Sequence, residues 1–303
     1  MTPRELVQGN VQLLSLPEVC LRIQQLADDP YADISEFAQL VAQDPALTTR
    51  LLKLVNSAYF GFPGRVDTIS RAVNLVGIAE LRNITLAMAA VEVFGGFEHE
   101  HFDLLGYWRH SVYTALTARF LARHARVLHA ERLFTAGLLH DIGRLLIFNL
   151  LPESAARIRR RMDQGMDACA AEREELGFDH AEAGSELLEL WRLPRELRIT
   201  VALHHAPETA PAARLETAAV HVANQIARQV EATAPDNRTP RSDPFSTWTD
   251  PLALDAAETL PHIDAIAAAT WSQAGLAPEI VPEAVAAAAR DFDEVLNILY
   301  SVP

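Results

Sequence analysis

The stretch Gly137-Leu138-Leu139-His140-Asp141-Ile142-Gly143-Arg144-Leu145-Leu146 places a histidine and an aspartate side by side among leucine and isoleucine. Moving a charged carboxylate into such surroundings is costly unless a partner compensates for it. A divalent metal ion is one such partner, because imidazole and carboxylate are both common metal ligands. The alternative is a buried His–Asp pair that links or caps helices. The positions of the other histidines decide between these interpretations.

The composition favours a mostly helical protein with a sizeable core. Hydrophobic residues make up 50% of the 303 residues, and there are only 13 glycines, which fits one large domain or two of ordinary size. We find no run of eighteen apolar residues and no signal-peptide pattern at the start, so we expect a cytoplasmic protein without a membrane span. The cysteines, Cys20 and Cys169, are far apart, and each lies in a helical pattern. We interpret them as buried small residues rather than a disulfide or a metal site.

The charge of the chain narrows the range of partners. Acidic residues outnumber basic ones by 40 to 26, and the formal net charge is -14. Such a surface repels phosphate backbones, which argues against broad binding to nucleic acid or to an anionic membrane. A small basic pocket for a phosphorylated ligand remains compatible with this charge.

The first part of the chain, residues 1–96, has the apolar period of short α-helices. Pro17 fits a first helical turn, Ser35 is a candidate N-cap, and Asp44-Pro45 opens another helix. The aromatic loop at residues 56–64 has two interpretations, a binding surface or a plug in a hydrophobic seam. The burial preference of aromatic rings favours the plug.

Residues 97–230 predict a second group of helices, and most of the histidines lie in it. One helix begins at Trp108, and the next extends from Glu131 to Leu151 as a single element. A further helix covers Ala181 to Trp191, with Asp179 as its N-cap and His180 in its first turn. There the helix dipole favours a neutral imidazole. Two more helices follow, one reaching His204-His205 and one from Ala218 to Val230.

Three further segments of the chain give weaker signals. Residues 231–251 hold four prolines and few apolar side chains, which predicts a flexible linker or long loop before C-terminal helices within 252–303. The pair His99 and His101 is a weak metal signal that we interpret as solvated. The four arginines within residues 157–161 could grip phosphate, but a solvated helix face is the favoured interpretation.

The histidines recur at a spacing that suits a helical bundle. Intervals of 30, 40 and 24 residues separate His110, His140, His180 and His204. Each interval is about the length of one helix plus a connection, so antiparallel neighbours could bring these side chains to one pocket. Many metal sites in bundles are built in this way. The other possibility, in a chain with 11 histidines, is a set of separate residues that hydrogen-bond locally.

Several motifs resemble known families. The Gly137–Gly143 stretch resembles the signature of the HD superfamily of metal-dependent phosphohydrolases, and the order of the other histidines resembles its multi-metal branch. Four earlier segments resemble the HDOD domain, the HD-related output domain of bacterial signalling proteins: Leu16-Pro17-Glu18-Val19, Gln43–Leu47, Leu52–Gly61 and Ile69–Val73. The resemblance covers about residues 10–230. It implies an all-α fold in which an N-terminal helical subdomain packs on an HD-like bundle.

The resemblance also implies a set of site residues. His110, His140 and Asp141 would bind a divalent metal such as Fe, Mn, Mg or Zn, and His180, His204 and His205 would hold a second ion or its bridging ligands. Asn224 takes the position of the family's closing aspartate. Because an amide oxygen is uncharged, Asn224 would be a weak ligand. If the protein is an enzyme, the catalytic candidates are Asp141 and Arg144.

Two departures from the family pattern affect the functional prediction. Arg144 stands where the related cyclic-dinucleotide phosphodiesterases have lysine, and their Gly-Tyr-Pro motif is missing after His204-His205. Arginine keeps the charge but does not readily donate a proton, which argues against cyclic-dinucleotide hydrolysis. The prediction is a cytoplasmic bacterial signal-transduction module that contacts signalling proteins or senses a small phosphorylated ligand. The alternatives are an active metal-dependent phosphohydrolase and a purely structural scaffold.

Overall fold

The computed structural model describes residues 1–27, 29, 31, 33–95, 102–128, 130–232 and 266–300. Within this part the regular structure is helical, and no strand is present. The prediction of an all-α fold is therefore confirmed. The predicted pair His99 and His101 lies outside the described residues.

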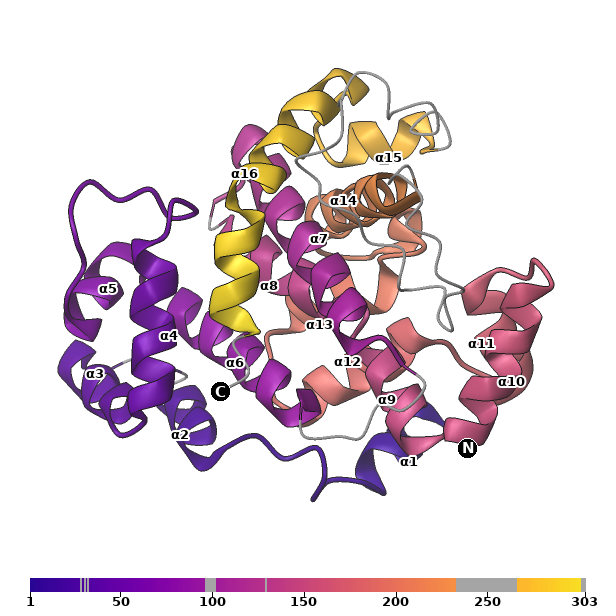
Figure 1. Cartoon of the computed structure of the whole chain (residues 1–303), viewed down its shortest axis with the longest axis horizontal. Helices are drawn as coiled ribbons and strands as arrows, with labels where there is room; N and C mark the ends of the chain where they lie inside the picture. Colours follow the sequence, from indigo (N-terminus) through magenta and orange to yellow (C-terminus); the bar gives the residue numbers. More distant parts are fainter. Residues whose placement is uncertain are drawn as a thin grey trace.

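The helices form an N-terminal group at one end of the molecule (Figure 1). This group runs along the chain as α2 (Glu18–Ala27), α3 (Ile34–Ala42), α4 (Pro45–Asn56), α5 (Ile69–Val76) and α6 (Ile78–Gly95). The short helix α1 (Pro3–Gln8) lies apart from it and packs against α12 of the bundle. The helix α6 is buried along most of its length and contacts both α2 and α8, so it joins the two groups around one core.

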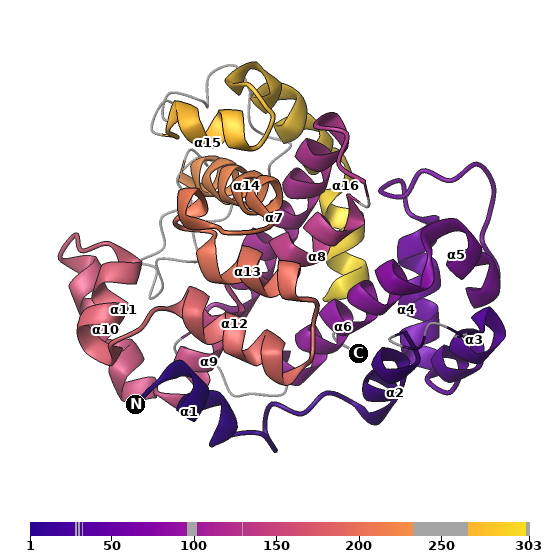
Figure 2. The ribbon, with the colours of Figure 1, turned by 180° about the vertical axis from the view of Figure 1, so that it is seen from behind.

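The bundle occupies the rest of the molecule, with α10 and α11 at the end opposite to α3 and α5 (Figures 1 and 2). Its helices are α7 (Leu104–His124), α8 (Glu131–Leu139), α9 (Ile142–Leu150), α10 (Pro152–Asp163), α11 (Ala168–Leu176), α12 (His180–Leu190), α13 (Arg195–Leu203) and α14 (Arg214–Ala232), with a 3-10 turn at Pro207–Thr209. Two C-terminal helices complete the described chain, α15 (Ala268–Gln273) and α16 (Val281–Leu299), and a 3-10 turn at Pro278–Ile280 precedes the second. The helix α16 packs on both α7 and α4. It therefore covers the seam between the bundle and the N-terminal group.

The helix caps follow the sequence with one correction. Asp44 caps α4, and Asp179 caps α12 in a capping box. The prediction that Ser35 caps α3 is wrong, because the carboxylate of Asp33 accepts the Ser35 backbone N–H at 2.9 Å. Asp33 has the extended backbone of an N-cap, and Ile34 after it is already helical.

The predicted single helix from Glu131 to Leu151 is wrong, because the chain breaks at His140 and Asp141. The helix α8 ends at Leu139, and α9 begins at Ile142. The side chain of His140 bonds back to the carbonyl of Gly137 at 2.7 Å, and Asp141 leaves the helical region with a φ of -99° and a ψ of 11°. The apolar stretch Glu131–Leu150 is long enough to cross a membrane, but 83% of the apolar 18-residue window within it is buried inside the fold.

Two glycines of the opening stretch allow the helices to approach closely. A Cβ on Gly143 would lie 1.9 Å from the carbonyl oxygen of His180, and one on Gly137 would lie 2.7 Å from the Cα of Ala115. Gly143 therefore lets α9 approach α12, and Gly137 lets α8 approach α7. These contacts bring four helices of the bundle together around His140.

The remaining local predictions have clear outcomes. Tyr59 and Phe60 of the aromatic loop are buried in the main core, which confirms the plug. In the arginine run, Arg157 and Arg161 form ion pairs with Glu175 of α11. The first two residues of the predicted linker at 231–251 belong to α14, and its other residues lie outside the described part.

Candidate metal centre

The bundle brings together the six side chains that the spacing had predicted. His110 comes from α7, His140 and Asp141 from the break between α8 and α9, His180 from the start of α12, and His204 and His205 from the end of α13. Around Oδ1 of Asp141, the Nε2 atoms of His180, His204 and His140 lie at 3.0, 3.3 and 3.5 Å respectively. The separate-histidine alternative is thereby excluded.

The other two histidines lie at the edges of this cluster. Nε2 of His110 is 3.3 Å from Nε2 of His140, and Nε2 of His205 is 2.9 Å from Nε2 of His180. The donors form two groups that share Asp141, one with His110 and His140 and the other with His180, His204 and His205. His140, His180 and His204 are fully buried, whereas His110 and His205 are partly accessible. The cluster therefore faces solvent on the side of these last two residues.

Hydrogen bonds fix the orientation of four of the rings. The Nδ1 atoms of His140 and His204 lie 2.7 Å from the carbonyl oxygens of Gly137 and Val201. A carbonyl oxygen can only accept, so each of these rings carries its proton on Nδ1 and turns an Nε2 lone pair to the centre. Nδ1 of His110 and His180 donates to the carboxylates of Glu231 and Glu172 at 2.5 and 2.6 Å. Such partners are typical behind the histidine ligands of metals.

This donor set fits a divalent metal ion. Oδ1 of Asp141 and Nε2 of His204 are buried and have no hydrogen-bond partner within the described residues. Lone pairs held about 3 Å apart repel each other unless a cation lies between them. Separations of 3.0–3.5 Å also match neighbouring ligands around an ion with bonds of about 2.1 Å. A set rich in imidazole with one carboxylate suits zinc or iron better than magnesium.

Asn224 has a buried amide on the helix that closes the cluster. On α14 it shares a face with His221, Arg228 and Glu231, at successive intervals of three, four and three residues. His221 bonds to the carbonyl of His204 at 2.7 Å, and Glu231 bonds to His110. Oδ1 of Asn224 is buried without a partner in the described part of the chain. This orphaned oxygen fits its predicted role as a weak, uncharged ligand.

Arg144 forms a buried ion pair with the central carboxylate. Its Nε lies 2.9 Å from Oδ2 of Asp141, and both side chains are almost fully buried. Burial alone would raise the pKa of Asp141, but Arg144 and the neighbouring histidines hold that pKa well below its usual value. Asp141 is therefore ionised, with Oδ2 held by arginine and Oδ1 turned to the histidines.

The charge of Glu172 acts on His180 against the effect expected from the helix dipole. Burial lowers the pKa of His180, but the charge of Glu172 outweighs this and raises the pKa to about 9. Without a bound cation this raised pKa favours the protonated ring at neutral pH, and the neutral imidazole expected for metal binding stays a prediction. Nε2 then carries a proton that can be donated to Nε2 of His205 at 2.9 Å and that lies beside the charged Oδ1 of Asp141, and a metal ion would displace it. Burial lowers the pKa of His140, His204 and His205 below the usual value, so these rings are neutral.

Glu172 and Glu231 are the functional residues that the sequence reasoning missed. Glu231 follows Asn224 by seven residues, the spacing that returns a helix to the same face, so this signal was present in the sequence. Glu172 lies eight residues before His180, in a different helix. Only the turn between α11 and α12 brings it to both the backbone N–H and the ring of His180.

Cys169 also lies beside the cluster, with its sulfur within ligand range of Glu172 and His180. Burial raises the pKa of its thiol to about 12. A protonated thiol is a poor ligand, and Cys20, in α2, is likewise buried and free. The donors that fit a metal are the imidazoles and Asp141.

Comparison with known proteins identifies the family. The family model for the HDOD domain matches residues 13–207. This chain belongs to the HDOD family. The match covers the N-terminal group and the bundle as far as the paired histidines, and the resemblance noted in the sequence is thereby confirmed.

Solved structures share the fold of this HDOD protein. A proposed phosphohydrolase from Shewanella amazonensis SB2B is 26% identical, with a TM-score of 0.72 and 97% of both chains covered. An HDOD domain protein of unknown function from Geobacter sulfurreducens is 22% identical, with a TM-score of 0.71 over 98% of this chain and all of the other. A proposed signal-transduction protein from Marinobacter aquaeolei VT8 is 20% identical, with a TM-score of 0.62 over 97% of this chain and 61% of that one. The last two likenesses concern the fold alone.

One curated protein is a relative in sequence. An uncharacterised protein from Treponema pallidum (strain Nichols) is 31% identical over 231 residues, which make up 75% of this chain. The HDOD chain spans 44% of the length of that relative.

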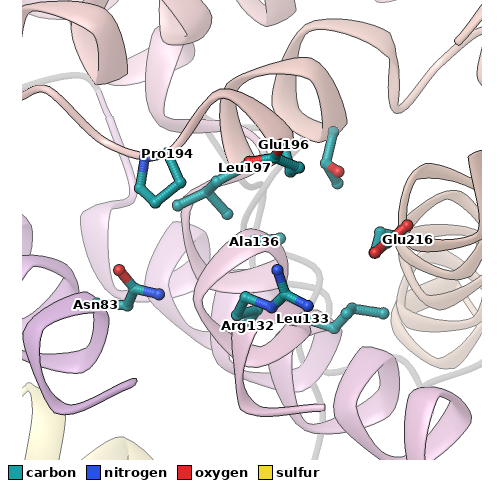
Figure 3. Close-up of a pocket in the computed structure, with 9 residues that line it drawn as sticks. Asn83, Arg132, Leu133, Ala136, Pro194, Glu196, Leu197 and Glu216 are labelled. Atoms are coloured by element: carbon teal, nitrogen blue, oxygen red, sulfur yellow. The ribbon is translucent and has the colours of Figure 1, made fainter. Parts of the chain in front are cut away.

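A separate cavity lies at the seam between the N-terminal group and the bundle (Figure 3). Asn83 of α6, Arg132 of α8, and Glu196 and Glu216 of the later helices line it, and no residue of the histidine–aspartate cluster does. Its volume is about 20 Å³, enough for a water molecule but not for a phosphorylated ligand. It is a packing gap between the two parts of the HDOD domain.

Proposed function

We propose that this HDOD protein is a bacterial signal-transduction module built around a divalent metal centre. Its output would be contact with signalling proteins or the binding of a small phosphorylated ligand. The observation that carries this proposal is the cluster itself, five imidazoles around one buried carboxylate, with four of the rings oriented by outer partners. Buried polar groups lower the stability of the fold unless a hydrogen-bond partner or a metal ion compensates for them. A cluster of this kind without a function would therefore be costly to the fold.

The ion would have a defined place in the chemistry of this centre. When bound, it would attract a phosphoryl oxygen as a Lewis acid and make a water molecule more acidic. The residues of the chain would hold the ion. Asp141 supplies a negative charge and the histidines supply neutral donors, while Glu172 orients the His180 ring and Glu231 orients the His110 ring. Arg144 fixes the orientation of Asp141.

Arg144 and Asn224 favour binding over turnover. Hydrolysis of a phosphoester needs a group that protonates the leaving oxygen. Burial lowers the pKa of Arg144, but Asp141 outweighs this and raises it above its already high value, so Arg144 keeps its proton. Asn224 replaces a carboxylate by a neutral amide, which weakens the hold on a metal ion. The module is therefore proposed as a metal-containing binding domain.

An active phosphohydrolase is the second candidate, and two observations favour it. The chain is 26% identical, over 97% of its length, to a proposed phosphohydrolase. In addition, Arg228 lies on the cluster-facing side of α14, partly exposed and without an ion pair in the described residues. Burial lowers the pKa of His205 and His221, and the positive charge of Arg228 lowers both further. A cation at this edge would attract a phosphate group.

Metal analysis tests the proposed centre. We expect protein purified without chelator to contain a stoichiometric divalent metal, and the His140→Ala/Asp141→Ala double variant to lose it. Arg160→Gln, which changes an exposed arginine of α10, is the control for a general effect of mutation. Equal and negligible metal in the wild type and the double variant would refute the centre.

A panel of phosphomonoesters and phosphodiesters with manganese, iron or magnesium separates the two candidates. The binding module predicts metal without turnover. Turnover that disappears in Asp141→Ala would instead establish the phosphohydrolase.

A further inference from the structure

The loop between α4 and α5 borders a cleft that the metal centre does not use. Its volume is about 650 Å³, within the usual range of small-molecule sites. The side chains that matter in its wall are Lys53, Asn56, Phe62 and Arg65, together with Asp67. None of these residues belongs to the metal cluster, and all of them lie in the N-terminal group.

The cleft is basic in a chain that is strongly acidic. Lys53 is the only lysine of the sequence, in which the other basic residues are arginines. Lys53 and Arg65 are exposed, and neither forms an ion pair within the described residues. Elsewhere the arginines of this protein are commonly paired, as Arg50 is with Glu92 at 3.0 Å. Asp67 is the single carboxylate of the cleft, which leaves two cations against one anion.

Hydrogen bonds hold the cleft in shape. The side-chain amide of Asn56 donates to the carbonyls of Leu52 and Val66, and its oxygen accepts the backbone N–H of Val66, each at 2.7 Å. These bonds tie the loop to the last turn of α4. Gly64 has a φ of +94°, and no atom lies within 4 Å of the place where a Cβ would be. The space beside Gly64 is therefore open. A ligand would meet a preformed site and would lose little affinity to ordering it.

One wall of the cleft is aromatic. Phe62 is partly buried and is stacked on Phe60, with 5.6 Å between ring centroids and 21° between ring planes. Phe60 is itself buried in the core, which holds the Phe62 ring in position. Fixed aromatic rings bind planar ligands such as nucleobases by stacking.

We propose that this cleft is a second binding site, for a phosphorylated small molecule with a planar ring, such as a nucleotide. Lys53 and Arg65 bind the phosphate groups, Lys53 as a compact point charge and Arg65 through its planar guanidinium. Phe62 stacks on the ring. The site is separate from the metal centre and does not depend on the metal.

The loop is also linked to the helices that carry the metal ligands. Arg119 of α7 lies over the Tyr59 ring, 3.7 Å from its centroid, and donates to the Tyr59 carbonyl at 2.6 Å. The same guanidinium pairs with Glu131 at 3.2 Å, the first residue of α8. The helix α7 carries His110, and α8 leads into His140. The cleft is therefore connected to the metal centre by packed helices and one buried arginine.

Calorimetric titration of the full chain with ADP tests the site. We expect ADP to bind the wild type, and the Lys53→Gln/Arg65→Gln variant to bind about tenfold or more weakly, because charge-assisted contacts are lost. Arg160→Gln, an exposed arginine outside the cleft, should bind like the wild type. Phe62→Ala should weaken ADP binding more than it weakens the binding of inorganic pyrophosphate, which has no ring.

The Asp141→Ala variant separates this site from the metal centre. We expect it to bind ADP with wild-type affinity even if its metal content falls. ADP binding that is lost in Asp141→Ala but kept in Lys53→Gln/Arg65→Gln would place the nucleotide at the metal centre and overturn the proposal. An absence of ADP binding by the wild type at millimolar concentration would overturn it as well. Metal content is measured on the same samples, so a failure of the metal centre is recognised independently.

Discussion

Replacing Gly143 by alanine should separate α9 from α12 and open the metal cluster. The added Cβ would lie 1.9 Å from the carbonyl oxygen of His180 and 2.6 Å from the amide nitrogen of Gly184. Both contacts are with backbone, so no side-chain rotation relieves them. A Cβ needs more than about 3 Å from such atoms, and α12 must therefore shift by about 1 Å or more. Overpacking of a well-packed interior costs about 1–3 kcal/mol, and occasionally more.

His180 opens α12, so the shift reaches the cluster directly. Its Nε2 is 3.0 Å from Oδ1 of Asp141, and a displacement of about 1 Å is enough to break ligand geometry, which must hold within about 0.2 Å. We expect Gly143→Ala to lower the free energy of unfolding by about 3 kcal/mol, the upper part of the usual range because the clash is with backbone. We also expect it to lose bound metal.

Urea unfolding monitored by circular dichroism, with metal analysis of the same samples, measures both effects. Gly95→Ala is the matched control, because Gly95 ends α6 and no atom lies within 4 Å of the place where its Cβ would be. Alanine there should be neutral or stabilising by up to about 1 kcal/mol. A Gly143→Ala protein as stable as the wild type, with its metal retained, would refute the close approach of α9 and α12.

Three further predictions concern the charges of the protein. Asn224→Asp should raise metal affinity, measured by competition with a chelator, because a carboxylate replaces a neutral amide; unchanged affinity would show that this side chain is not a ligand. Glu231→Gln should lower metal affinity by about 10–100-fold through loss of the partner of His110, with helix content unchanged in circular dichroism. Glu80 is buried at the seam, and burial raises its pKa from 4.5 to about 7. Since the folded pKa lies above the unfolded one, the stabilising contribution of Glu80 is complete below pH 4.5 and is lost as the pH rises through about 7. Wild-type stability relative to Glu80→Gln should therefore fall by up to about 3 kcal/mol over this interval, and parallel pH profiles of the two proteins in urea unfolding would contradict it.

The sequence carried enough information for the fold class and for the six principal donors. The helical period and the intervals between histidines can be measured along the sequence. In a bundle, intervals of one helix plus a connection bring the histidine side chains close together. The break at His140 and Asp141 was not predicted, because the apolar pattern continues through it. At the end of α8 the ring of His140 bonds to the Gly137 carbonyl, and a helical period carries no signal of a side chain that bonds to its own backbone.

The outer carboxylates were missed for a different reason. Glu172 reaches His180 through the geometry of a turn, and its chemistry resembles that of any surface glutamate in an acidic chain. The same limit applies to Ser35, where two nearby capping residues competed and Asp33 took the position. A contact that depends on how two helices or a helix and a turn are placed relative to each other cannot be predicted from the pattern of residues along the sequence.

The charges around the cluster favour a cation even without the closing aspartate. Asp141, Glu172 and Glu231 bring three negative charges, and Arg144 brings one positive charge, which leaves two negative charges when the histidines are neutral. One divalent ion neutralises this balance, and buried charge is costly unless it is neutralised. A second ion would leave the cluster with a net positive charge. The exchange of aspartate for Asn224 removes one negative charge from the family pattern, and this loss of charge favours one ion over two in the proposed centre.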